Sequence, residues 1–340
     1  MPSPPRVSVL VVTFESASVL PALLAALARE RRDGDELIVV DNDSTDASAT
    51  LARDAGARVI VNPANRGFAA AANQAAAAAS GDVLVLLNPD AVPEAGFREA
   101  IVRPGLEGWD LWMGLVLDGD VVNTSGGVVH FTGIAWAGEA GAPAPPPGVG
   151  GQRTVGFASG ACLALPRRAW EALGGFSPEF FMYHADVDLS LRMRLIGGRV
   201  GVDPAARVHH DYTFAKGPAK WRALERNRWA TILRTYPTPL LAAVAPALVA
   251  LELALWPAAL AAGWGREKAL ATADVVRALP RLARERRAIQ ATRTVSVARF
   301  AAGLTAELSS PYLGALARSR ALALVLRAYW WGVRRLLRNR

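Results

Sequence analysis

Four short apolar runs, each ending in polar residues, alternate with helical segments over residues 7–87 of this 340-residue chain. The runs are rich in Val, Ile and Leu, which is typical of strands buried on both faces of a parallel sheet. We expect strands at 7–13, 36–40, 58–61 and 82–87, and helices at 19–29, 45–55 and 68–80. The alternation with short crossovers predicts an α/β fold with a doubly wound, mainly parallel sheet.

The polar residues that follow these strands belong to one edge of the predicted sheet. Ligands of open α/β sheets bind at the carboxyl ends of the strands. Four polar tips at one edge are hard to explain by packing alone, so we expect a binding site there. The tips are residues 13–15, 41–43, 62–67 and 88–90.

Charge divides the chain near residue 212. Residues 1–212 hold 16 Lys and Arg against 24 Asp and Glu, whereas residues 213–340 hold 22 against 6. We therefore predict two domains, 1–212 and 213–340, of which the second is helical and faces an anionic partner. That partner is either a lipid surface or nucleic acid, and the apolar run 240–264 favours lipid over nucleic acid.

The apolar run is long enough to cross a bilayer, but Glu252 lies near its middle. Two prolines, Pro246 and Pro257, interrupt it, so we favour helices that lie in the membrane interface. Residues 318–340 combine Leu, Tyr and Trp with arginines, as expected of an amphipathic helix on an anionic surface. The start of the chain lacks a secretory signal pattern, which predicts the cytoplasmic face of the cell membrane.

Two further patterns exclude common chemistries. The single cysteine, Cys162, lies in an apolar run and is expected to be a buried structural thiol. No G-x-G-x-x-G follows the first strand and no G-x-x-x-x-G-K-[ST] occurs, which argues against the usual dinucleotide and P-loop sites.

Six motifs follow one another in a fixed order. They are VSVLVVTF (7–14), VVDNDSTD (39–46), NRGFAAAAN (65–73), LNPD (87–90), ASGAC (158–162), and GGF (174–176) with FMYHADVDL (181–189). Together they resemble those of family 2 glycosyltransferases, especially the rhamnosyltransferase-like branch of bacterial cell-surface polysaccharide synthesis, over roughly residues 7–212. The resemblance implies a GT-A fold, inverting transfer from a UDP- or dTDP-sugar, Mg²⁺ or Mn²⁺, and a polyprenyl-linked or glycan acceptor. Rhamnose is the sugar to test first.

The resemblance assigns the chemistry of transfer to three positions. Asp186 would be the general base that removes the proton of the acceptor hydroxyl. Asp90 would bind the metal, with His210 as a second ligand. Strand alternation sends His209 and His210 to opposite faces, so only one of them can face the site. The plainer alternatives are a helix cap for Asp186 and a simple turn around Asp90.

The remaining predicted contacts are to the nucleotide and the sugar. Asp41 would accept a hydrogen bond from a uracil or thymine base, although it could instead cap the following helix. Asn65 and Gly67 precede a helix whose N-terminus suits a pyrophosphate, and an ordinary loop is the alternative. Flanking positions are expected to line the same pocket: Thr13, Glu15, Asn73 and Asn88.

Two departures from the family pattern keep other functions open. Ala185 stands where the family usually has Glu, and Asn88 replaces the first acid of its D-x-D motif. Both would fit a catalytically inactive membrane scaffold. A sugar nucleotidyltransferase is a second alternative, but its glycine-rich loop with Arg and Lys is absent after the first strand.

Overall fold

The computed structural model describes residues 4–210, 217, 219–309 and 319–338, which form two compact units. The first unit comprises Met1–Gly127, Ala137–Met193 and Gly198–Tyr212. The second comprises Val128–Trp136, Arg194–Gly197 and Thr213–Arg340. The predicted boundary between 1–212 and 213–340 falls within 211–216, outside the described residues, and stays a prediction.

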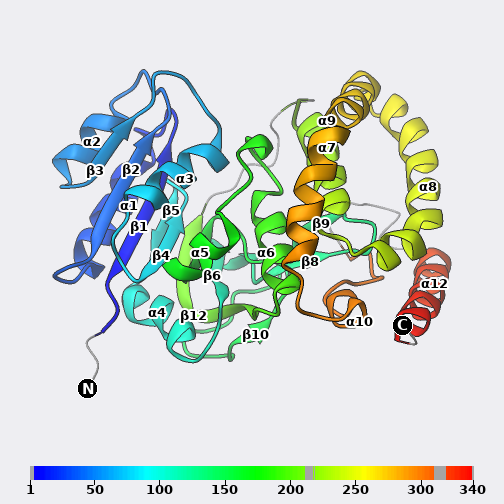
Figure 1. The fold of residues 1–340 in the computed structure, drawn as a ribbon. Coiled ribbons are helices and arrows are strands. Elements are labelled where there is room, and N and C mark those ends of the chain that lie inside the picture. The colour runs from blue at the N-terminus through cyan, green and yellow to red at the C-terminus, as the bar shows by residue number, and fades with distance from the viewer. Residues whose placement is uncertain (1–3, 211–216, 218, 310–318, 339–340) are drawn as a thin grey trace. The chain divides into compact units, whose positions relative to one another are not determined.

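A mixed sheet with the order β10-β12-β6-β11-β4-β1-β2-β3 forms the core of the first unit (Figure 1). Strands β4, β1, β2 and β3 are parallel, as their apolar composition predicts. Strand β11 runs antiparallel between β4 and β6. The α/β class with a mainly parallel central sheet is therefore confirmed. The strands of this sheet are β1 (Val7–Thr13), β2 (Glu36–Asp41), β3 (Arg58–Val61), β4 (Val83–Leu87), β5 (Ala91–Pro93), β6 (Leu111–Asp118), β7 (Val121–Thr124), β10 (Arg153–Thr154), β11 (Cys162–Pro166) and β12 (Val200–His210). A separate pair, β8 (Gly127–Val129) and β9 (Ala135–Ala137), lies mostly in the second unit.

Helices of the first unit cover the sheet and follow the predicted pattern with one clear difference. Helix α3 packs on β1 and β2, and α4 packs on β6, β11 and β12. Helix α2 begins three residues later than the predicted 45, because Asp46 accepts hydrogen bonds from the backbone and hydroxyl of Ser48. The helices are α1 (Leu20–Glu30), α2 (Ser48–Asp54), α3 (Phe68–Ala78), α4 (Phe97–Leu106), α5 (Arg167–Leu173), the 3₁₀ turn η1 (Pro178–Phe180) and α6 (Ala185–Leu195).

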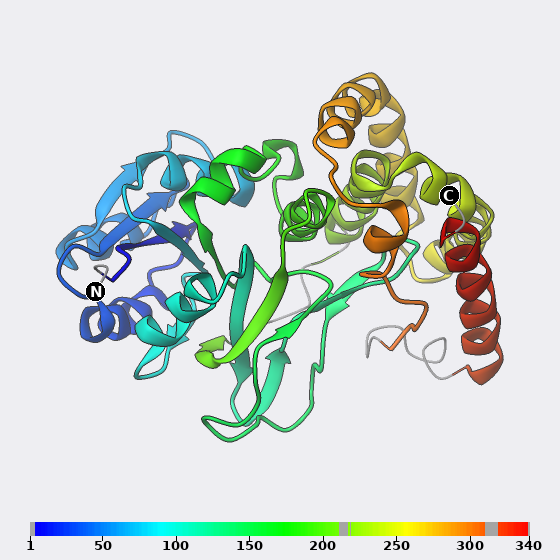
Figure 2. The ribbon, with the colours of Figure 1, turned by 60° about the horizontal axis from the view of Figure 1, so that its bottom comes forward.

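The second unit is helical, and its helices contact one another as a bundle (Figure 2). Helix α9 contacts α7 and α8, and α12 contacts α8 and α10. The expectation that Pro246 and Pro257 interrupt the apolar run is wrong, since α8 continues through both. The helices are α7 (Ala219–Thr235), α8 (Thr238–Ala261), α9 (Gly265–Ala291), α10 (Val297–Ala301) and α12 (Arg320–Arg338).

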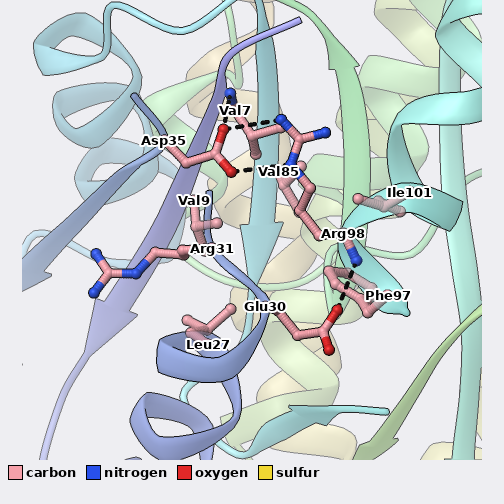
Figure 3. Close-up of a pocket in the computed structure, with 10 residues that line it drawn as sticks. All are labelled: Val7, Val9, Leu27, Glu30, Arg31, Asp35, Val85, Phe97, Arg98 and Ile101. Atoms are coloured by element: carbon pink, nitrogen blue, oxygen red, sulfur yellow. Dashed lines mark hydrogen bonds and ion pairs between the residues drawn. The ribbon is translucent and has the colours of Figure 1, made fainter. Parts of the chain in front are cut away.

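A small pocket in the first unit lies at the amino ends of the strands, away from the predicted binding edge (Figure 3). A buried ion pair lines it, with Asp35 accepting from Arg98 at 2.9 and 3.0 Å. The same carboxylate accepts from the backbone of Val7 at 2.9 Å. These bonds join β1 to α4, so we interpret this pocket as structural.

Candidate active site

Asp41 ends β2 and lies buried beside Thr13 at the end of β1. The Thr13 hydroxyl donates to Oδ1 of Asp41 at 2.8 Å, and the backbone N–H of Ser44 donates to Oδ2 at 3.2 Å. The second bond is the turn contact that the plainer alternative predicted. Each carboxylate oxygen has two lone pairs, so Asp41 retains acceptor capacity for a ligand.

Glu15 lies at the same edge but is engaged with the next loop. Its carboxylate accepts from the backbone and hydroxyl of Thr45 at 2.7 and 3.1 Å. Its backbone has a φ of 50°, in the left-handed region that non-glycine residues rarely adopt. The exposed ring of Phe14 stands between Glu15 and Thr13. The sequence analysis gave Phe14 no role, although it lies between two residues expected to line the nucleotide pocket; its exposure became evident only in the structure.

Side-chain amides after β2 and β3 form a cluster that sequence reasoning missed. Asn42 donates to Asn65 at 2.8 Å and accepts from Asn62 at 3.0 Å. The Asn65 carbonyl oxygen also accepts from the backbone N–H of Gly67 at 2.9 Å. Asn65 therefore shapes the turn into α3 with contacts inside the protein. Only contacts between loops distant in the chain reveal this cluster.

Asn73 lies on α3 and uses its amide group on the backbone of Phe176. It donates to the Phe176 carbonyl at 2.8 Å and accepts from the Phe176 N–H at 2.9 Å. This pair of bonds fixes the Gly174-Gly175 turn against α3, so the structure gives Asn73 a positioning contact. Its predicted contact with the sugar or nucleotide stays a prediction.

Asn88, Asp90 and His210 come together at the carboxyl ends of β4 and β12. The His210 Nε2 atom lies 3.1 Å from Oδ1 of Asp90 and 3.1 Å from Nδ2 of Asn88. His209 points to the other side, where its Nε2 lies 2.9 Å from Glu94. His210 is 4% exposed and His209 46%, as the expected alternation requires.

The ligand chemistry at this point fits a divalent cation. A carboxylate oxygen is a ligand for Mg²⁺ and Mn²⁺, and an imidazole nitrogen beside it favours a transition metal over Mg²⁺. Within the described residues no group of three or more His, Cys, Asp and Glu gathers. Asp90 and His210 would supply only two ligands to such a cation, and a diphosphate and water would have to supply the others.

Asp186 lies in the first turn of α6, and backbone N–H groups hold its carboxylate. Gly160 donates to Oδ2 at 3.0 Å and Val187 donates to Oδ1 at 2.9 Å. Burial raises the pKa of Asp186 above its usual value of 3.8, although these bonds act in the opposite direction. A carboxylate with a raised pKa that keeps partial solvent access is suited to accept a proton.

The neighbouring carboxylate, Asp188, has a different environment. It forms a buried ion pair with Arg192 at 2.8 Å. Arg192 also donates to the carbonyls of Leu173 and Gly175 at 2.6 Å each. The pair therefore holds the glycine turn in place, and Asp186 remains the candidate base.

The segment before α6 is strained and lies against the start of α3. Phe181, Tyr183 and His184 have φ values of 48°, 66° and 61°. The Phe181 carbonyl accepts from the N–H of Ala69 at 3.3 Å, and a Cβ added at Gly67 would lie 2.5 Å from the Phe181 ring. Gly67 is thus required for close approach to this segment. Strained backbone of this kind is common at functional sites.

The Asp90 and Asp186 regions lie at the same edge of the sheet. The Asn88 N–H donates to the Ala161 carbonyl at 3.1 Å, directly after Gly160, which binds Asp186. Cys162 pairs with Leu87 in the antiparallel β11–β4 ladder, so residues 160–162 lie at the carboxyl end of β4. Cys162 is buried, and burial raises its thiol pKa to about 12, which confirms a structural thiol.

The chain is similar in sequence to known glycosyltransferases. Residues 8–124 match the family model of glycosyl transferase family 2. The chain is 27% identical over 246 residues to the N-acetylglucosaminyl-diphospho-decaprenol L-rhamnosyltransferase of Mycobacterium tuberculosis, covering 62% of this chain and 77% of that protein. It is 31% identical over 225 residues to the O-antigen biosynthesis protein RfbC of Myxococcus xanthus, covering 61% of this chain and 17% of that protein.

Solved structures share the fold. The chain superposes on GalNAc-T7, solved with UDP, GalNAc and Mn²⁺, with a TM-score of 0.59 and 16% identity over 72% of this chain and 51% of that one. It superposes on residues 1–349 of TarS from S. aureus, solved with UDP, with a TM-score of 0.55 and 16% identity over 98% and 90%. At these identities the likeness concerns the fold alone.

Proposed function

Because this chain belongs to the family 2 glycosyltransferases, in their rhamnosyltransferase-like branch, we propose that it transfers a sugar from a UDP- or dTDP-sugar to a hydroxyl group with inversion. The observation that carries this proposal is the gathering of Asp41, Asp90 with His210, and Asp186 at one edge of the sheet. Asp41 would serve the nucleotide base, Asp90 with His210 the diphosphate, and Asp186 the acceptor hydroxyl.

The nucleotide would bind over the ends of β1 and β2. The Asp41 carboxylate has the acceptor capacity to take a hydrogen bond from the base, and the exposed Phe14 ring offers it a stacking surface. Asp90 and His210 would hold Mn²⁺ or Mg²⁺ against the diphosphate. Bound there, the cation neutralises the charge that develops on the leaving group.

Asp186 would perform the proton transfer. Its carboxylate accepts the proton of the acceptor hydroxyl as that oxygen bonds to the anomeric carbon. The bond from that carbon to the diphosphate oxygen breaks on the opposite face, and the nucleoside diphosphate leaves with the electron pair. The N–H groups of Gly160 and Val187 fix the carboxylate for this step.

The acceptor is proposed from the first relative above, whose name specifies an N-acetylglucosaminyl-diphospho-decaprenol. We propose a sugar on a polyprenyl diphosphate or a growing glycan as the acceptor, rhamnose as the first donor sugar to test, and the cytoplasmic face of the membrane as the place. This class of acceptor agrees with a second unit whose surface is basic and partly apolar.

A panel of UDP-, dTDP- and GDP-sugars, each with Mn²⁺, tests the proposal. One donor should raise the melting temperature selectively and release its nucleotide when a lipid-linked acceptor is added. NMR of the product should show an anomeric configuration opposite to that of the donor. If no donor binds or turns over in the panel, the chain acts as a scaffold and the proposal is wrong.

A further inference from the structure

Helix α8 presents a stripe of large apolar side chains to solvent. Val249, Leu253, Trp256 and Leu260 are 59%, 70%, 36% and 67% exposed. Their spacing of four, three and four residues places them on one side of the helix. Exposed apolar stripes of this size on soluble proteins mark contacts with a protein or a membrane.

The single charge of α8, Glu252, lies at the border between this stripe and the buried side of the helix, and it is held inside the second unit. Glu252 accepts from Arg228 on α7 at 2.5 Å and from Lys268 on α9 at 2.7 Å. It also accepts from the indole N–H of Trp229 at 3.0 Å. Arg228 and Lys268 are almost fully buried, so α8 is tied to both neighbouring helices at its middle.

These contacts limit the orientation that α8 can adopt in a bilayer. At 24 residues it is long and apolar enough to cross one. A crossing α8 would carry Arg228 and Lys268 to the middle of the hydrocarbon, together with α7 and α9. Helix α9 holds ten charged residues among its 27, and each would cost several kcal/mol there. An orientation in the plane of the interface avoids this cost.

Helix α12 adds a basic, apolar surface next to the N-terminal part of α8. The Tyr329 hydroxyl donates to the carbonyl of Ala243 on α8 at 2.6 Å. On its exposed side α12 carries Leu324, Val325 and Trp331, and the Arg335 guanidinium lies 5.4 Å from the Trp331 ring. Arginine beside exposed tryptophan suits the headgroup region of an anionic membrane.

We propose that α8 and α12 dock the second unit on an anionic lipid surface, with the α8 stripe inserted into one leaflet and no segment of α8 crossing it. The 22 basic against 6 acidic residues of 213–340 supply the charge complementarity. This deepens the proposed function by naming the surface on which a lipid-linked acceptor is met. The test measures binding to membranes and not sugar transfer, so the docking proposal and the proposed function can each fail independently of the other.

The first experiment measures binding of the full chain to vesicles of phosphatidylglycerol and phosphatidylcholine, and of phosphatidylcholine alone. The double variant L253E/L260E should lose at least about tenfold in affinity for the anionic vesicles, since two inserted leucines become charged. The matched control is Leu106→Glu on α4, equally exposed at 70%, which should bind like the wild type. Unchanged binding of the double variant would overturn the proposal, as would a wild type that binds DNA or dimerises but does not bind vesicles.

The second experiment distinguishes docking from crossing. Cysteine is introduced at either end of α8, as T238C or A262C, and the protein is added to sealed anionic vesicles with a membrane-impermeant maleimide. Buried Cys162 should not react, so the wild type is the blank. Both variants should be labelled from outside. Protection of one end only would show that α8 crosses the bilayer and would contradict the proposal.

Discussion

Each of the two units holds a carboxylate that is largely removed from solvent, and the surroundings shift its pKa in opposite directions. Asp186 in the first unit is held by backbone N–H groups, and burial raises its pKa. In the second unit burial alone would raise the pKa of Glu225, but the charges of Arg228 and Lys268 outweigh it and lower the pKa to about 2. The first arrangement leaves a carboxylate ready to take a proton, whereas the second fixes it as a permanent anion.

The largest expected effect is the loss of turnover on removing the carboxylate of Asp186. Asp186→Asn keeps the shape of the side chain but cannot accept a proton, so turnover should fall by about 10²–10⁴-fold. The melting temperature at neutral pH should be unchanged or higher, because the variant removes a charge that burial disfavours. Nucleotide release and thermal unfolding measure the two quantities.

The control for this variant is Asp118→Asn at the exposed end of β6, which should leave turnover unchanged. If Asp186→Asn turns over like the wild type, another group must act as the base and the contrast between the two units disappears.

The carboxylates of Glu225 and Glu252 are held by two cations, so removing one cation should lower stability, whereas Asp186→Asn should not. Arg228→Met leaves the half-buried carboxylates of Glu225 and Glu252 with one buried cation, Lys268, in place of two. Unfolding in urea should show a loss of about 3–5 kcal/mol. Arg277→Met, which removes a 73% exposed cation from the same unit, should change stability by less than about 0.5 kcal/mol. Equal effects from the two variants would contradict the proposed locking.

The predicted metal site offers a matched pair of neighbouring histidines. His210→Ala removes the imidazole beside Asp90 and should raise the Mn²⁺ concentration for half-maximal turnover by about 10–100-fold. His209→Ala removes the side chain that faces Glu94 and should not change it. A manganese titration that responds equally to both substitutions would rule out His210 as a ligand.

The smallest effect concerns the space beside the base. A Cβ at residue 160 would lie 3.6 Å from the Phe68 ring and 3.8 Å from the Asp186 carboxylate, so the fold can accept it. Gly160→Ala should lower kcat/KM about tenfold, since a methyl group fills room needed by a substrate. Gly151→Ala, whose new Cβ meets open space, should match the wild type. Equal kcat/KM values would show that no substrate approaches Gly160.

The sequence predicted the strand tips and the placement of His210, because strand periodicity and strand ends are local properties. It could not predict that Asn73 bonds Phe176, which lies 103 residues away, or that Arg192 supports the glycine turn. Nor could it show that Glu252 meets Arg228 and Lys268, since those contacts depend on how three helices pack. The family resemblance pointed to the candidate base, whereas long-range contacts determine its environment.

The pH dependence of kcat/KM tests the role of Asp186 most directly. Only the ionised carboxylate can accept a proton, so activity should fall as the pH drops through the raised pKa of Asp186, at a pH above the usual 3.8. The residual activity of Asp186→Asn should lack this acidic limb, while circular dichroism confirms that both proteins stay folded. A wild-type limb at or below pH 3.8, or the same limb in the variant, would contradict the assignment of Asp186 as the base.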